Sequence, residues 1–163
     1  MITFEAELSA SSLEALITKL DKYAKSLDEA TTDINKAIAE RAEELVKTNV
    51  HSEAYDEGDL EESIQSEYNS EYARVYTEND HAAYAEFGIG IVGEGSHPEA
   101  LAKGWVYDKN AHGDKGWFYT DKNGKKWFTR GYTGRKYMYN SYITLKQELN
   151  DIAKDVLKRK ELI

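Results

Sequence analysis

Apolar positions follow two different periods along the first fifty residues. Residues 1–8 alternate between apolar and polar side chains, and this period of two predicts a half-buried strand. The following apolar residues recur every three or four positions, which is the spacing of an amphipathic helix. We expect one helix over about residues 12–27 and a second along residues 34–49, packed on each other or on one face of a sheet.

The middle of the chain loses the helical period. Residues 51–62 are acidic, contain a glycine and show no period, which predicts an exposed loop. Residues 64–68 and 72–78 alternate again around two turn-forming residues and predict a pair of antiparallel strands. Residues 81–87 fit either a strand or one helical turn. Four glycines then fall within eight residues, so we expect a flexible, hinge-like arm over about residues 88–98.

The segment 104–142 is rich in aromatic residues, with 11 among its 39 positions, including all three tryptophans. Two aromatic runs flank Asn123-Gly124 within residues 117–129, and this arrangement predicts a β-hairpin with a tight turn. From about Asn140 the helical period returns. The expected helix ends in a basic last turn, where the helix dipole favours cations.

Together these elements predict an α+β fold in one domain over residues 1–163. The domain would contain an antiparallel sheet, two N-terminal helices, one C-terminal helix and an aromatic β-hairpin insertion at about residues 117–129. No stretch approaches the roughly 20 apolar residues that cross a bilayer, so we expect no membrane partner.

Charge is distributed unevenly along the chain. The net charge of −9 argues against a protein that holds nucleic acid by bulk charge. Residues 1–86 hold 7 basic and 21 acidic side chains, a net charge of −14, whereas residues 87–163 hold 14 and 9, a net charge of +5. This division fits two differently solvated faces. It also fits a subunit that docks head to tail on a copy of itself.

Few residue patterns indicate catalysis or metal binding. The chain has no cysteine, which excludes disulfides and thiolate metal sites. Its four histidines lack the spacing of a metal-binding helix, and the acidic stretch around Gly58 lacks the ligand order of an EF-hand loop. The glycines near Gly90 lack the βαβ context of a dinucleotide site. We therefore expect no catalytic residue, cofactor or metal ion, although the 30 acidic residues leave a small hydrolase open.

The aromatic segment allows three interpretations. Its rings could cover one face of a sheet as part of the core. Exposed tyrosine and tryptophan side chains could instead anchor a protein partner, because these residues are enriched at interfaces. They could also stack on sugar rings, as in a module that binds cell-wall glycan.

Three stretches, in this order, resemble one family of minor tail components from long-tailed bacteriophages and prophages. Residues 58–64 (Gly-Asp-Leu-Glu-Glu-Ser-Ile) resemble its Thr-Gly-x-Leu-x-x-Ser-Ile motif. Residues 81–88 (His-Ala-Ala-Tyr-Ala-Glu-Phe-Gly) resemble its Tyr-Ala-x-x-x-Glu-x-Gly segment. After Gly104-Trp105, residues 129–139 (Thr-Arg-Gly-Tyr-Thr-Gly-Arg-Lys-Tyr-Met-Tyr) resemble its Thr-Lys-Gly-x-x-Ala-Arg-Pro-Phe-Met-Tyr tail, which leads into a final helix.

The resemblance implies a non-enzymatic virion protein of the neck or tail-completion region, made and assembled in the bacterial host cytoplasm. Related proteins form rings between the head connector and the tail tube. The implied partners are therefore copies of the chain itself, for example in a hexameric ring, and phage connector, tail-terminator or tail-tube proteins. DNA would only pass through such a ring, because acidic charge around a channel repels phosphate.

We expect the assembly contacts on the acidic loop, the glycine-rich arm and the aromatic hairpin. The candidate residues are Gly58, Asp59, Leu60, Glu61 and Glu62; Gly88, Gly90, Gly93 and Gly95; and Trp117, Phe118, Trp127 and Phe128. The alternative functions are an aromatic module for cell-wall glycan, a small hydrolase, and an acidic DNA mimic. The positive charge of the C-terminal half argues against the DNA mimic.

Overall fold

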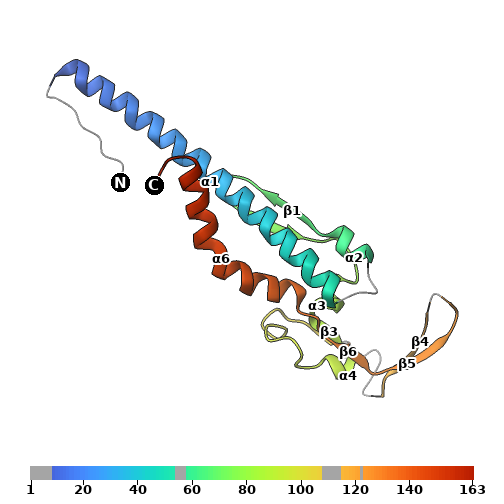
Figure 1. Cartoon of the computed structure of the whole chain (residues 1–163). Helices are drawn as coiled ribbons and strands as arrows, with labels where there is room; N and C mark the ends of the chain where they lie inside the picture. Colours follow the sequence, from blue (N-terminus) through green and yellow to red (C-terminus); the bar gives the residue numbers. More distant parts are fainter. Residues whose placement is uncertain (1–8, 54–57, 108–114, 122) are drawn as a thin grey trace. The chain divides into compact units, whose positions relative to one another are not determined.

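The computed structural model describes residues 9–53, 58–107, 115–121 and 123–163, so the strand expected at residues 1–8 lies outside the described residues. The chain divides into two compact units, whose elements are labelled in Figure 1. Unit 1 contains the chain up to Leu45 together with Gln65–Tyr76 and Ile143–Ile163, and unit 2 contains Val46–Ile64 and Thr77–Tyr142.

Helix α1 is one continuous helix of 44 residues, Ala10–Glu53. The prediction of two shorter helices was wrong, because the polar residues between them do not interrupt the backbone. This segment contains no glycine or proline. Ser26 and Thr31 donate their hydroxyls to backbone carbonyls four residues earlier in the helix, at 3.0 and 3.1 Å. At the start, the hydroxyl of Ser9 accepts a hydrogen bond from the backbone N–H of Ser12 at 3.2 Å and caps the helix.

In unit 1 a polar hairpin packs on α1. Strands β1 (Gln65–Tyr68) and β2 (Ala73–Tyr76) pair antiparallel, as the alternation predicted. The amide of Asn35 on α1 donates a hydrogen bond to the backbone carbonyl of Asn69 in the turn, at 2.8 Å. The hairpin is therefore tied to the helix through its backbone.

Helix α6 (Tyr137–Arg159) confirms the predicted C-terminal helix and its basic last turn. Within unit 1 it is joined to α1 by a two-point contact, in which the guanidinium of Arg41 donates to both carboxylate oxygens of Glu148, at 2.7 and 2.9 Å. These hydrogen bonds stabilise both charged forms. They lower the pKa of Glu148 below its ordinary value and raise the pKa of Arg41.

Unit 2 is assembled from short elements. Its helices and strands are α2 (Gly58–Ser63), α3 (Ala82–Phe87), β3 (Gly88–Ile89), α4 (Gly90–Gly93), β4 (Trp117–Thr120), β5 (Lys126–Thr129) and β6 (Gly131–Thr133). The mixture of helices and antiparallel strands confirms the α+β class. The described strands do not form the one sheet that we expected, but three separate pairs, β1–β2, β3–β6 and β4–β5. Each of these strands is only two to four residues long.

The structure also changes the picture of the segments expected to be irregular. Residues 58–62 belong to helix α2 and not to an exposed loop, because Leu60 is fully buried and holds the turn against the core. Residues 54–57 lie outside the described residues. Residues 81–87 take the helical alternative, as α3.

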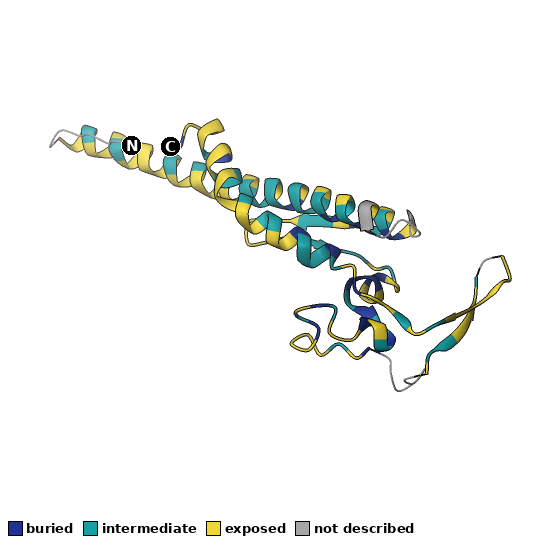
Figure 2. Cartoon of the chain, turned by 60° about the horizontal axis from the view of Figure 1, so that its bottom comes forward, coloured by how far each residue is buried: buried dark blue, intermediate teal, exposed yellow. Residues whose placement is uncertain are grey.

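Each unit has its own buried apolar residues, drawn in dark blue in Figure 2. Those of unit 1 include Ala30, Ala39, Val156 and Leu162, and those of unit 2 include Val50, Leu60, Ile64 and Tyr137. Among the described helices, none combines the length and the apolar character needed to cross a membrane.

Candidate functional site

The aromatic hairpin forms as the Asn123-Gly124 signal predicted. Strands β4 and β5 pair antiparallel from Trp117↔Thr129 to Thr120↔Lys126. At the turn, Gly124 has a φ of +79°, a conformation that favours glycine. The carboxylate of Asp121 accepts hydrogen bonds from the backbone N–H groups of Asn123 and Lys125, both at 2.9 Å.

Both faces of this hairpin carry exposed rings. On one face, Phe118 and Phe128 are directly opposite each other with ring centroids 5.1 Å apart, and they are 72% and 53% exposed. On the other face, Tyr119 and Trp127 form a second cross-strand pair and are 48% and 43% exposed. The interpretation of the aromatic segment as core is therefore wrong for the hairpin, although it holds for the buried Tyr137.

The exposed rings lie among cationic side chains. The ammonium of Lys125 stands 3.8 Å from the ring centroid of Trp127. The indole N–H of Trp127 also donates to the Asp121 carboxylate at 2.8 Å, so this ring is held in place. Lys126 and Arg130 are exposed nearby in sequence. The hairpin thus offers exposed aromatic side chains, which are enriched at protein interfaces, beside an excess of positive charge.

The base of the hairpin is closed by glycines. Gly90 donates its N–H to the carbonyl of Tyr107 at 2.6 Å and forms a bridge with Gly131. Gly131 has a φ of +98°, and a Cβ there would overlap the backbone carbonyl of Ile89. The close approach of these backbones therefore requires glycine at position 131.

The glycine-rich segment 88–98 is folded against β6. Gly88, Gly90 and Gly93 are buried, whereas Gly95 is exposed. The hydroxyl of Ser96 closes the segment, because it donates to the Gly93 carbonyl at 2.6 Å and accepts from the backbone N–H of Gly134 at 2.7 Å. In this structure three of the four glycines named as assembly candidates serve close backbone packing.

The acidic candidates on α2 divide into buried and exposed positions. Leu60 is fully buried and does not reach the surface. The carboxylate of Glu61 contacts a ring nitrogen of His51 at 3.1 Å. Asp59 and Glu62 are exposed, so these two carboxylates are the ones that this helix offers to a partner.

Unit 2 contains a buried pair, Glu86 and His97, whose side chains belong to residues that are 6% and 5% exposed. His97 accepts from the backbone N–H of Glu99 through Nδ1 at 3.1 Å, so its proton resides on Nε2 and is donated to Oε1 of Glu86 at 3.0 Å. The Glu86 carboxylate also accepts from the backbone N–H groups of Met138 and Tyr139, at 2.8 and 3.0 Å. It therefore caps the first turn of α6, where the helix dipole favours an anion.

Through Glu86, this pair joins two of the stretches that carry the resemblance. Glu86 belongs to residues 81–88, and the two N–H groups that it binds belong to residues 129–139. A pocket of about 490 Å³ adjoins the pair and is lined by, among others, Phe87, Lys103 and Tyr142. Both carboxylate oxygens and both imidazole nitrogens already have hydrogen-bond partners, so the arrangement acts as a structural link.

The described residues show no group of three or more histidine or acidic side chains placed to hold a metal ion. Asp56 and Glu57 of the acidic stretch lie outside the described residues. The metal and calcium interpretations thus gain no support from the part of the chain that the structure describes.

Sequence reasoning missed one feature of this region and left a second, the exposure of the hairpin, as one of three interpretations. Glu86 contacts His97, which lies 11 residues further along the chain, and also the first turn of α6, which lies about 50 residues further along. No local period in the sequence indicates contacts over such separations. The exposure of the hairpin did have a signal. Trp117, Phe118 and Tyr119 are consecutive, and consecutive strand residues point to opposite faces, so they cannot all enter one core.

Comparison with known proteins supports the resemblance noted from the motifs. Residues 14–88 match the HK97-gp10-like family, described as "Bacteriophage HK97-gp10, putative tail-component". The match includes the motifs at residues 58–64 and 81–88 and ends before the aromatic hairpin. It confirms the similarity to a phage tail-component family over this part of the chain. Neither a curated protein nor a solved structure matches the chain.

Proposed function

We propose that this protein is a structural subunit of the neck or tail-completion region of a long-tailed phage virion, assembled at the head–tail junction as a member of a ring. The similarity of residues 14–88 to a phage tail-component family supports a structural tail protein. The assembly takes place in the host cytoplasm, and the virion is the final location. The subunit contacts copies of itself and neighbouring connector, tail-terminator or tail-tube proteins, and DNA only passes by.

The observation that carries the proposal is the exposed aromatic hairpin. Its two faces present Phe118 with Phe128 and Tyr119 with Trp127 to solvent. A two-stranded hairpin is marginally stable by itself, and exposed rings gain free energy when a partner covers them. These properties are those of a docking element.

Charge supplies the complementary surface on the partner. The hairpin carries Lys125 and Lys126, whereas residues 1–86 carry a net charge of −14. Exposed carboxylates on α2, such as Asp59 and Glu62, are suited to meet a basic hairpin from the next subunit. Contacts of this head-to-tail kind close into a ring when the rotation between subunits allows it.

The test replaces the aromatic side chains on one face of the hairpin and keeps its two strands. In the variant Phe118→Thr/Phe128→Thr, threonine keeps the β-propensity while the exposed apolar area is lost. We expect fewer particles with a head joined to a tail when virions are produced with this variant, and electron microscopy counts them. The purified variant should no longer form ring-shaped oligomers. The matched control is Asn140→Ala on α6, away from the hairpin in sequence. Normal particles from the double variant would refute a docking role for this face.

A second candidate function is binding of bacterial cell-wall glycan. The observation in its favour is the Tyr119–Trp127 pair, because Asp121 and Lys125 hold the indole at the surface where a sugar ring could stack on it. The variant Tyr119→Thr/Trp127→Thr tests it by retention on purified cell-wall material. Loss of retention in this variant, with retention kept in Phe118→Thr/Phe128→Thr, would favour glycan binding. No retention of the parent protein would eliminate it.

We propose no catalytic residue. The Glu86–His97 pair is the arrangement most similar to a catalytic dyad among those described above, and its polar atoms are already engaged in holding α6. A structural role for the chain requires none of them to react.

A further inference from the structure

The pocket beside Glu86 and His97, here called the unit 2 pocket, has walls of aromatic and aliphatic side chains. Its volume of about 490 Å³ lies in the range of about 300–1,000 Å³ that is typical of ligand pockets. The apolar part of its lining consists of Ala82, Ala83, Phe87, Met138, Tyr139 and Tyr142. The ring of His97 meets those of Phe87 and Tyr139 edge to face, with centroids 4.5 and 5.4 Å apart. Aromatic rings favour such edge contacts, so these walls suit an aromatic occupant.

The buried pair at this pocket offers an occupant no unused hydrogen-bonding group. Both carboxylate oxygens of Glu86 and both ring nitrogens of His97 already have partners. A polar ligand placed against them would lose its hydrogen bonds to water without gaining replacements, and this loss costs free energy. An apolar group has no such bonds to lose. The chemistry of the pocket therefore favours an apolar occupant.

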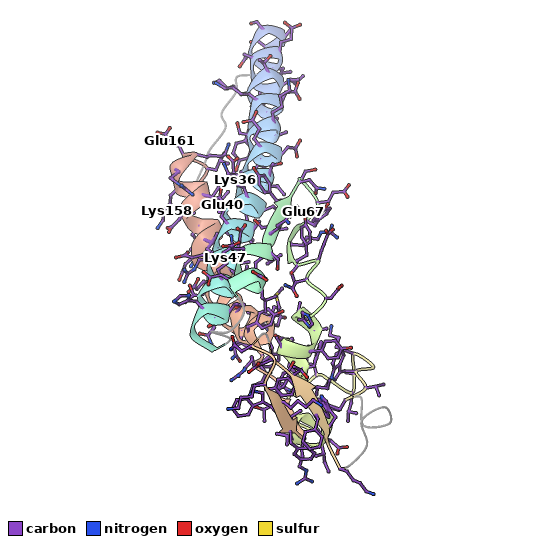
Figure 3. All side chains as sticks on the ribbon, turned by 90° about the vertical axis from the view of Figure 1, so that its right-hand side faces the viewer. Lys36, Glu40, Lys47, Glu67, Lys158 and Glu161 are labelled. Carbon is purple, nitrogen blue, oxygen red and sulfur yellow. The ribbon has the colours of Figure 1, made fainter. Side chains whose placement is uncertain are left out.

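A pocket in unit 1 has the opposite character. It has a volume of about 330 Å³ and is lined mainly by charged side chains, among them Lys36 and Glu40 of α1, which are labelled in Figure 3. Lys160 and Asp33, also in its lining, pair at 2.7 Å. An apolar ring placed there would displace water from these charges, which is unfavourable. The unit 2 pocket is therefore the better one for a ring.

The chain itself carries exposed rings of the kind that the unit 2 pocket suits. Phe118 and Phe128 form one face of the aromatic hairpin and are 72% and 53% exposed. None of the described residues of the hairpin lines the pocket, so these rings do not occupy the pocket of their own chain. The opposite face of the hairpin is less suited, because Tyr119 would bring a phenolic hydroxyl into apolar surroundings.

Charge on the phenylalanine face is complementary to charge in the pocket. Side chains two positions apart on a strand share a face, so Lys126 lies on the same face as Phe128. The charged side chains that line the pocket are two carboxylates and one ammonium, a net charge of −1, from Glu86, Glu99 and Lys103. The ammonium of Lys126 would therefore approach a site of opposite sign.

We propose that the unit 2 pocket receives the ring of Phe118 from the hairpin of a second copy of this chain. This inference rests on the proposed docking role of the hairpin and names the surface on which it docks. The hairpin and the pocket are different surfaces of one chain, so the contact is head to tail. Each copy uses its hairpin on one neighbour and its pocket on the other, as a closed ring requires.

Complementary variants test the two surfaces. Ala83→Trp fills the pocket from an exposed position of α3, and Phe118→Thr/Phe128→Thr removes the inserted rings. In sedimentation we expect each variant alone to associate at least about 30-fold more weakly than the parent protein, a factor that corresponds to the lost burial of one ring. In a mixture, the intact hairpin of the first variant fits the open pocket of the second. We therefore expect dimers with one copy of each variant and no larger species.

The matched control is Ala102→Trp, which adds the same side chain to unit 2 at an exposed alanine that does not line the pocket. It should associate like the parent protein. Circular dichroism confirms that all variants keep their fold.

The outcomes separate this inference from the proposed function. If Ala83→Trp associates like the parent protein while Phe118→Thr/Phe128→Thr does not, the hairpin docks elsewhere, and only the pocket assignment is refuted. If the phenylalanine variant associates like the parent protein, the docking role of this face fails and the pocket assignment fails with it. A parent protein that stays monomeric at high concentration, or a mixture of the two variants that stays monomeric, would also refute the pocket assignment.

A photoreactive analogue of phenylalanine tests the contact without any change in the pocket. p-Benzoylphenylalanine replaces Phe118 in one preparation and Tyr119, on the opposite face of the hairpin, in the control. After irradiation we expect dimers from the first preparation in which position 118 is linked to Met138 or another lining residue. Because Tyr119 points to the other face, the control should give less than about one tenth of that yield. The absence of cross-linked dimers, or links only to residues outside the lining, would overturn the proposal.

Discussion

Two hairpins of the same size in this chain differ in chemistry and in burial. The β1–β2 hairpin, Gln-Ser-Glu-Tyr paired with Ala-Arg-Val-Tyr, is largely polar yet has half-buried positions on both strands. The β4–β5 hairpin, Trp-Phe-Tyr-Thr paired with Lys-Trp-Phe-Thr, is aromatic yet more exposed. Both turns are stabilised in the same way: the side-chain oxygen of Asn69 in one, and of Asp121 in the other, accepts hydrogen bonds from two backbone N–H groups.

The difference teaches that the neighbours of a strand pair, and not its own hydrophobicity, decide its burial in the single chain. The polar hairpin is fixed to α1 by Asn35, and also by the hydroxyl of Ser66, which donates to Glu43 at 2.5 Å. The aromatic hairpin is held in unit 2 at its base. Its apolar area stays exposed in the single chain, and this exposure is the physical basis of the docking role proposed above.

The largest expected effect comes from the base of the aromatic hairpin. Gly131→Ala places a Cβ against the Ile89 carbonyl at a positive φ, and we expect it to lower the free energy of unfolding of unit 2 by about 3 kcal/mol. The matched control is Gly124→Ala at the tip, where φ is also positive but nothing lies within 4 Å of the added Cβ. Its cost should be about 1 kcal/mol. Urea unfolding followed by circular dichroism measures both, and equal costs would contradict the packing at the base.

A smaller effect compares a buried aliphatic residue with the exposed rings. Val156→Ala removes two methyl groups from the core of unit 1 and should lower the free energy of unfolding by about 2 kcal/mol. Phe118→Thr/Phe128→Thr removes far more apolar area but should cost less than about 1 kcal/mol in the isolated chain, since that area is already in water. A larger loss from the double variant would show that the rings are buried within the chain.

The smallest effect concerns the pH dependence of the polar hairpin. The hydroxyl of Tyr72 donates to Glu67 at 2.6 Å, and this bond, with a further one from Arg74, holds the pKa of Glu67 below its ordinary value of 4.5. Because the folded carboxylate binds its proton less readily than the unfolded one, its contribution is present above pH 4.5 and is lost as pH falls through the lowered pKa. Tyr72→Phe should move the NMR titration of Glu67 upward. Tyr68→Phe is the control, and an unmoved titration in Tyr72→Phe would rule out this cause.

The predictability of the fold depended on whether the signal was local. The signals for the Asn123-Gly124 turn and for the alternation of β1 and β2 each lie within a few residues, and the structure confirms both predictions. The division of α1 into two helices was wrong, because the hydroxyls of Ser26 and Thr31 bond back to helix carbonyls and the polar stretch does not end the helix.

The parts that could not be predicted depend on distant contacts. Nothing near Leu60 in sequence indicates that it is fully buried, and nothing near Glu86 indicates that it caps α6. The apolar face of α1 was visible in the sequence as a helical period. Only the structure shows that Leu20 and Leu27 on this face are exposed, whereas Ala30 is buried.

The closure at Gly90 has a consequence for how this chain can vary. The backbone leaves the glycine base after Tyr107 and returns to it at Arg130, whose carbonyl accepts from the N–H of Val92 at 3.2 Å. The segment between Tyr107 and Arg130 therefore starts and ends at the same glycine base. Since the entropy of closing a loop rises only slowly with its length, the intervening residues could be lengthened, shortened or exchanged at little thermodynamic penalty to unit 2. Evolution or an engineer could therefore exchange this segment at its base while keeping the rest of unit 2 unchanged.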